Sequence, residues 1–83
     1  MTTYGCNIYD LDGQWLTSLS DKDFRRVYES ARIWVRLPAD YSRIRFYRSC
    51  DGKHDLIGGI DRIYGFSILT MFRTGGGVRQ IFL

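Results

Sequence analysis

The feature that most constrains the fold is a change of hydrophobic period along the chain. Between residues 24 and 34, apolar side chains recur every three or four positions. From residue 43 to residue 73, two runs of strand-forming residues flank an Asp-Gly turn signal. The first spacing predicts one amphipathic helix, and the second predicts the central hairpin of an antiparallel sheet. One helix and several strands in 83 residues indicate a single α+β domain over residues 1–83.

The N-terminal residues are expected to form a first hairpin. Thr3–Asp10 alternates the apolar Tyr4, Cys6 and Ile8 with other residues, which is typical of a strand. Asp10–Gly13 supplies a turn, and Gln14–Ser18 returns as a second strand. The acidic residues of this turn do not have the spacing of a calcium-binding loop.

The helix is expected to start at Ser20–Asp23, where a serine and an aspartate three residues later can cap the free backbone N–H groups. It is expected to end around Ile33–Arg36, because Pro38 disfavours helical angles at the residue before it. One stripe is predicted to pack on the sheet. It consists of Phe24, Val27, Tyr28, Ala31 and Trp34.

The C-terminal half reads as strands throughout. In the strand that starts at Arg43, Ile44 and Phe46 should face one way and the polar residues the other. Leu56–Ile60 is expected to be a short strand interrupted by a bulge or bend at its glycine pair, and Asp61–Arg73 one long central strand. Val78–Leu83 should close the sheet, after a glycine-rich turn.

The predicted fold is therefore an antiparallel sheet of about five strands in ββαβββ order, with one helix packed on one face. A single helix covers only part of such a sheet. Aromatic side chains on the other face should remain partly uncovered, and exposed apolar patches often mark a partner or a dimer interface. These side chains are Tyr47, Tyr64, Phe66 and Phe72.

No catalytic or metal-binding set is predicted. His54 is the only histidine, and it lies in a polar turn after Cys50, where a Cys–His nucleophile pair would have no pocket. Cys6, Cys50 and His54 offer too few ligands for a zinc site. The two cysteines are expected to be free thiols rather than a disulfide. The protein is thus expected to be neither an enzyme nor dependent on a cofactor.

Positive charge is concentrated in the second half of the chain. Residues 1–42 contain five Lys or Arg against six Asp or Glu, whereas residues 43–83 contain seven against three. Ten of the twelve cations are arginine, which suits contacts with carboxylates and phosphates, although a genomic bias in codon usage would produce the same excess. The predicted binding residues are the cations and tyrosines of the strand region: Arg43, Arg45, Tyr47, Arg48, Lys53, Arg62, Tyr64, Arg73 and Arg79.

Three classes of partner or activity stay open. The favoured partner is a protein or nucleoprotein complex with an acidic surface. Direct binding of RNA or DNA is the first alternative, since sheets that bind RNA use exposed aromatics and arginines. A small RNase-type toxin that uses His54 is the second, and a homodimer is a further expectation. The chain has no apolar run long enough to span a bilayer and no signal peptide, so no membrane partner and a cytoplasmic location are expected.

In size and architecture the chain resembles small phage-encoded inhibitors of host defence, of the anti-CRISPR kind. The features that it shares with them are a short α+β chain, no targeting signal and no catalytic set. The resemblance implies a protein that acts by steric occlusion of a larger host complex, often at a nucleic-acid channel. It transfers no site residues.

Overall fold

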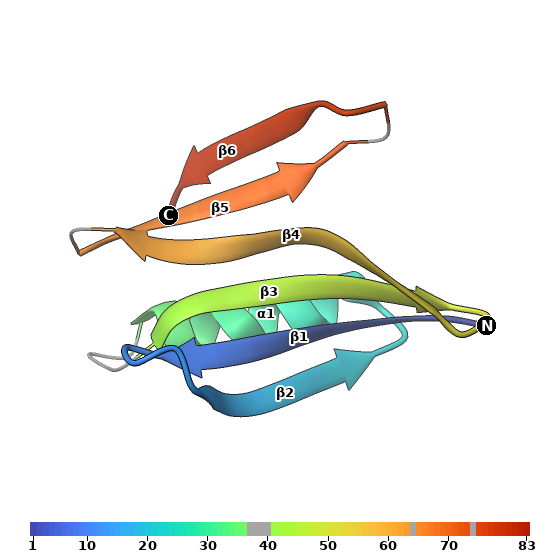
Figure 1. Ribbon diagram of the computed structural model, residues 1–83, viewed down its shortest axis with the longest axis horizontal. Coiled ribbons are helices and arrows are strands. Elements are labelled where there is room, and N and C mark those ends of the chain that lie inside the picture. The colour runs from blue at the N-terminus through green and yellow to red at the C-terminus, as the bar shows by residue number, and fades with distance from the viewer. Residues whose placement is uncertain (37–40, 64, 74) are drawn as a thin grey trace.

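The computed structural model describes residues 1–36, 41–63, 65–73 and 75–83. They form a six-stranded antiparallel sheet with the helix α1 (Phe24–Arg36) on one face (Figure 1). The strands are β1 (Thr2–Asp10), β2 (Trp15–Asp21), β3 (Tyr41–Cys50), β4 (Lys53–Ile63), β5 (Phe66–Phe72) and β6 (Val78–Phe82). Their order across the sheet is β2-β1-β3-β4-β5-β6. The predicted α+β class and the helix on one face are confirmed, but the described residues form six strands in ββαββββ order.

The predicted long strand Asp61–Arg73 is wrong. The chain reverses between β4 and β5, so that Ile63 pairs with Phe66 in a tight hairpin. Gly65 has φ +84°, a value that glycine adopts without the steric penalty of a side chain. Alternating residues on two strands joined by so short a turn resemble one continuous strand, and the sequence pattern therefore hid the break.

The start of the helix also differs from the prediction. Ser20 and Asp21 belong to β2, where they pair with Gly5 and Tyr4. The residue that caps α1 is Asp23, whose Oδ1 accepts a hydrogen bond of 2.9 Å from the N–H of Arg25. The predicted end at Ile33–Arg36 is confirmed, and the loop predicted to follow it lies, over residues 37–40, outside the described residues. Among the described residues, no helix combines the length and apolar character needed to cross a bilayer.

The core lies between α1 and the β1–β3–β4 part of the sheet. Val27 and Ala31 of α1 are buried, and the rest of the predicted stripe packs around them. The opposing strands contribute fully buried side chains, with Phe46 in edge-to-face contact with Phe24 at a centroid distance of 5.4 Å. These strand residues are Cys6, Ile8, Ile44, Phe46 and Ile60. Leu69 of β5 marks the limit of the core, and no residue of β6 is buried.

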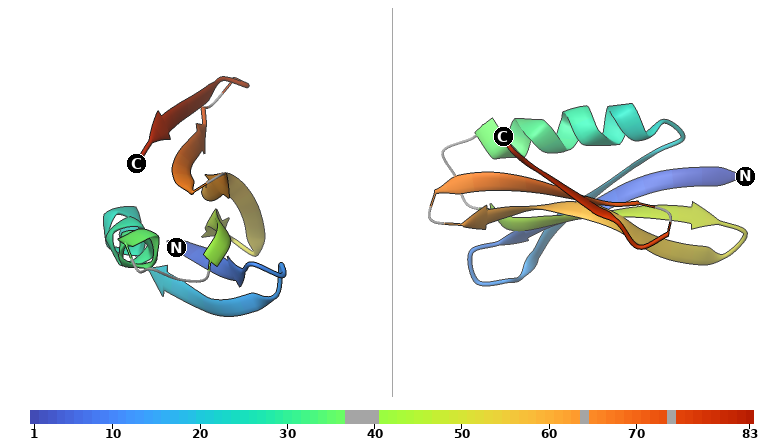
Figure 2. Two further views of the ribbon diagram at one scale, coloured as in Figure 1. Left: turned by 90° about the vertical axis from the view of Figure 1, so that its left-hand side faces the viewer. Right: turned by 90° about the horizontal axis from the view of Figure 1, so that it is seen from above.

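The glycine pair in β4 bends the sheet without interrupting the strand. β4 runs from Lys53 to Ile63, so it is longer than the predicted strand Leu56–Ile60. The predicted bulge at the glycine pair is confirmed, because the β3–β4 register shifts between Leu56 and Gly58. A Cβ atom on Gly58 would lie 2.4 Å from the carbonyl oxygen of Thr70, and one on Gly59 would lie 2.5 Å from that of Ile44. The backbones of β3 and β5 thus approach β4 at positions where only glycine fits. Seen end-on, the sheet curls toward the side that carries α1 (Figure 2).

Replacing Gly58 by alanine should destabilise the protein strongly. The new methyl group would overlap a backbone oxygen on the neighbouring strand, which cannot move without opening the β4–β5 ladder. We expect the free energy of unfolding to fall by about 2–3 kcal/mol, as measured by urea titration followed by circular dichroism. Gly77→Ala is the matched control, since its methyl group would meet only the flexible side chain of Arg73 at 3.4 Å. Equal stabilities of the two variants would contradict the proposed close approach.

Candidate functional site

The face of the sheet opposite α1, here called the outer face, contains three of the predicted binding residues. Arg43, Arg45 and Tyr47 alternate along β3 with the buried Ile44 and Phe46, as the sequence pattern predicts. The neighbouring strands place Tyr9 and Asp61 opposite Arg43 in the register. This part of the predicted set is therefore brought together.

The other predicted binding residues lie elsewhere. Arg48, Arg62 and Arg79 pair across the sheet with residues of the helix-bearing face, and Arg48 forms an ion pair of 3.6 Å with Asp55. Lys53 lies at the end of the β3–β4 hairpin and Arg73 directly after β5, and both are exposed. Tyr64 lies outside the described residues. The predicted set is thus divided between two faces and two hairpins, and a binding role for all nine residues stays a prediction.

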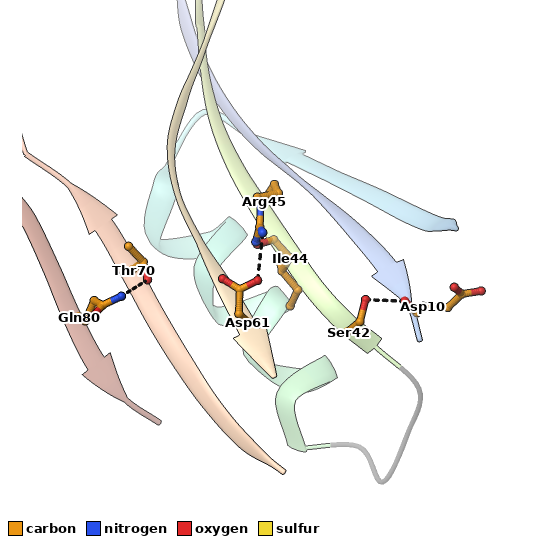
Figure 3. A network of polar contacts seen from close by, with 7 residues as sticks. All are labelled: Asp10, Ser42, Ile44, Arg45, Asp61, Thr70 and Gln80. Atoms are coloured by element: carbon orange, nitrogen blue, oxygen red, sulfur yellow. Dashed lines mark hydrogen bonds and ion pairs between the residues drawn. The ribbon is translucent and has the colours of Figure 1, made fainter. Parts of the chain in front are cut away.

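The two outer-face arginines differ in how they are held. Arg45 Nη2 lies 3.0 Å from Asp61 Oδ1, and its Nη1 donates to the carbonyl of Ile44 (Figure 3). The side chain lies flat over Gly59, where a Cβ atom would come within 2.9 Å of Nη1. Arg43 instead stacks on the ring of Tyr9, with its guanidinium carbon 5.1 Å from the ring centroid. Within the described part of the chain Arg43 has no ion pair, so its charge is available to a partner.

A shallow hollow of about 280 Å³ lies on the outer face over the glycine pair of β4. Its floor is glycine backbone, the Arg45–Asp61 pair supplies polar groups, and apolar side chains provide the rim. The lining residues are Arg45, Leu56, Gly58, Gly59, Asp61, Thr70 and Phe72. A volume at the lower end of ligand pockets suits one inserted side chain better than a cofactor.

Next to the hollow, the outer face of β4–β5–β6 has a row of large apolar side chains. Cross-strand pairs join them: Ile63 with Phe66, Ile68 with Phe82, and Phe72 with Val78. We call these six residues the apolar band. Phe66, Phe72 and Phe82 are 66%, 48% and 76% exposed. At about 200 Å² per ring, they alone expose on the order of 400 Å², within the range of the largest patch on a typical monomer.

Sequence reasoning identified Phe66 and Phe72 as uncovered but missed Val78 and Phe82. Val78–Leu83 was expected only to close the sheet. Its position as the last strand, far along the chain from the single helix, was the signal that it would lie at an uncovered edge.

The residues considered for catalysis are not brought together. Cys50 lies opposite Lys53 with its Sγ 3.7 Å from Asp51, whereas His54 Nδ1 lies 2.7 Å from Ser49 Oγ on the other face. The Ser49–His54 contact is a cross-strand pair on an exposed hairpin, and no third side chain among the described residues hydrogen-bonds to the imidazole to orient it. In the described ranges, no three His, Cys, Asp or Glu side chains gather as metal ligands would.

Both cysteines are free thiols, as predicted, but their environments differ. Cys6 is 2% exposed in the core. Burial raises the pKa of its thiol from 9.0 to about 11, and a backbone hydrogen bond at Leu19 offsets part of that rise. The fold therefore favours the protonated thiol. Cys50 is half-buried near the end of the β3–β4 hairpin.

A thiol reagent at pH 8 should modify Cys50 at least roughly 100-fold faster than Cys6, because two pKa units remove most of the reactive thiolate and burial blocks access. Cys50→Ser should abolish the fast phase in a chromogenic labelling assay.

The raised pKa of Cys6 also makes stability depend on pH. The contribution of the Cys6 thiol to the free energy of unfolding is fully present below pH 9 and is lost as pH rises toward 11. Cys6→Ala should reduce the alkaline loss of stability, and two equally fast thiols in the folded protein would disprove the assignment.

Comparison with family models, with curated proteins and with solved structures found no match to the chain. What the protein does is therefore inferred from its own side chains and their arrangement.

Proposed function

We propose that the protein is a non-enzymatic binding protein that docks on a larger protein or nucleoprotein complex through its outer face and inhibits that complex by steric occlusion. The observation that supports this most is the apolar band, in which three phenylalanines remain largely exposed. Ordinary surfaces scatter such residues singly, whereas these occur in cross-strand pairs, and exposed apolar side chains grouped in this way mark interaction sites.

The band can supply much of the binding free energy. Burying about 400 Å² of aromatic surface is worth on the order of 10 kcal/mol before the entropy of association and of side-chain ordering is subtracted. The free-energy cost of that lost entropy is of similar size, so the apolar band alone would bind a partner weakly. Specificity and further affinity must come from the polar groups next to it.

Two neighbouring features define the chemistry of the partner. The hollow beside Phe72 can accept one apolar side chain, and the Arg45–Asp61 pair supplies polar groups in its lining. Arg43 is held by stacking on Tyr9 and forms no ion pair with any described residue, which suits bidentate binding of a carboxylate. The partner surface should therefore combine apolar groups with an acidic group, in agreement with the acidic partner expected from the charge of the chain.

Direct nucleic-acid binding is the weaker proposal. It needs several cations along one track, whereas Arg45 and Arg48 are each neutralised by an aspartate and Arg62 and Arg79 lie on the helix-bearing face. The exposed Arg43–Tyr9 stack is the one observation that favours it.

We propose that the complex inhibited by steric occlusion belongs to a host-defence system, because the chain resembles anti-CRISPR proteins in size and architecture.

Phe66→Asp should weaken the complex with the partner protein by at least roughly 30-fold, because it places a charge in the apolar band at the end near the β4–β5 hairpin. The measurement is calorimetry or interferometry on a partner first isolated from host lysate, together with the loss of inhibition of that partner's activity. Leu11→Asp is the matched control, since Leu11 is 68% exposed in the β1–β2 turn, away from the band. If Phe66→Asp binds as tightly as Leu11→Asp, the outer face is not the interface.

A gel-shift assay with mixed DNA and RNA at low salt should show no complex. A shift that disappears steeply as salt rises, and that Arg43→Glu removes, would instead support nucleic-acid binding.

A further inference from the structure

Strand β6 forms one edge of the sheet and has little protection against pairing. Its register with β5 is continuous from Val78 to Phe82, without the bulge that irregular edges use. It contains no proline and a single charge, Arg79. The opposite edge, β2, differs because the β1–β2 register shifts and the strand ends in Ser20 and Asp21.

The backbone groups of β6 that point outward can be identified. The N–H of Leu83 donates to the carbonyl of Ser67, and the carbonyl of Gly77 accepts from the N–H of Arg73. In an antiparallel ladder, hydrogen-bonded residues alternate with residues whose groups point the other way. Val78, Gln80 and Phe82 therefore direct their N–H and C=O groups away from β5, toward the open side of the sheet (Figure 1).

We propose that β6 pairs antiparallel with β6 of a second copy of this chain, with Gln80 opposite Gln80 on a two-fold axis. In this register Val78 faces Phe82 of the second copy, and all three outward-pointing residues exchange both backbone hydrogen bonds. Shifting the axis to Arg79 would leave only two such pairs and would place the two arginines directly opposite each other. Shifting it to Ile81 also leaves two pairs. The sequence of β6 is thus complementary to itself in one register.

The side chains agree with the backbone register. On the outer face, Val78 packs beside Phe82 of the second copy, an aromatic and β-branched pair of the kind that stabilises sheets. Because Val78 already neighbours Phe72 and Phe82 neighbours Ile68, the apolar band becomes continuous across the two-fold axis. Phe82, which is 76% exposed and the most exposed residue of the band, would lose the most exposed area when the dimer forms.

The dimer should be weak and should respond to salt in a characteristic direction. One strand per copy buries less than standard interfaces do, so association should depend on concentration in the micromolar range. On the helix-bearing face, Arg79 lies diagonal to Arg79 of the second copy, with Cα atoms about 7–8 Å apart. Screening this repulsion means that added salt should strengthen the dimer. The proposed acidic partner would show the opposite salt response, and Phe66→Asp leaves β6 untouched, so the two proposals fail separately.

The test is sedimentation equilibrium of the full chain over a range of micromolar concentrations. We expect a monomer–dimer equilibrium that Gln80→Pro shifts to monomer, because proline removes an N–H that faces the second copy and not β5. Phe82→Lys should weaken the dimer by at least roughly tenfold through loss of the Val78 contact and added like charge. Leu16→Lys on β2, 39% exposed, is the matched control and should leave the equilibrium unchanged.

Disulfide trapping tests the register and does not depend on the proline variant folding. In a Cys50→Ser background, Gln80→Cys should form an intermolecular disulfide, since the two Cα atoms would lie about 5.5 Å apart. Val78→Cys should not cross-link to itself, because those atoms would be about 13 Å apart along the strands. If the protein stays monomeric at every concentration tested, the proposal is overturned, and β6 would then be available to pair with a strand of another protein. Cross-linking at Val78 but not Gln80, or a dimer that Gln80→Pro leaves intact, would also overturn the proposal.

Discussion

The contact on which the rest of the structure depends is the close approach of β3 and β5 to the glycine backbone of β4. At Gly58 and Gly59, neighbouring carbonyl oxygens occupy the space that a Cβ atom would need. Two adjacent glycines without side chains, next to a bulge in the β3–β4 register, allow β4 to bend here. The sheet consequently curls toward α1, and a helix of 13 residues is enough to seal a core over β1, β3 and β4.

The same bend explains why the protein has an uncovered half. The helix packs against β1, β2 and β3, while β5 and β6 extend beyond its reach (Figure 2). Apart from Leu69 and Met71 of β5, their apolar side chains lie outside the core of the monomer, and yet they occur in cross-strand pairs. In a small domain whose stability is limited by its buried surface, exposed aromatics of this number are a disadvantage unless a partner covers them. The two proposed interactions would cover different parts of this half: a partner protein would cover its outer face, and a second copy would cover the edge of β6.

The arginines show how little net charge says about a surface. On the outer face, Arg45 is neutralised by Asp61, whereas Arg43 stacks on Tyr9 and has no ion pair among the described residues. The excess of positive charge in the second half of the sequence is real, but the sheet directs alternate residues to opposite faces. A run such as Arg43, Arg45 and Arg48 is therefore split by the β3 pleat and cannot act as one basic patch.

The sequence by itself determined the elements with a clear period: the first hairpin, the stripe of α1, the facing of Ile44 and Phe46, and the Asp51-Gly52 turn. These features depend on residues close together in the chain, where alternation and spacing express the local geometry. It could not determine the break at Gly65, the cap at Asp23 or the order of strands, since a tight turn and a continuous strand show the same alternation. Which strand becomes an uncovered edge, and which arginines meet an aspartate, follows from pairing between distant segments. Only the tertiary structure decides that, because burial and register are properties of neighbours in space rather than in sequence.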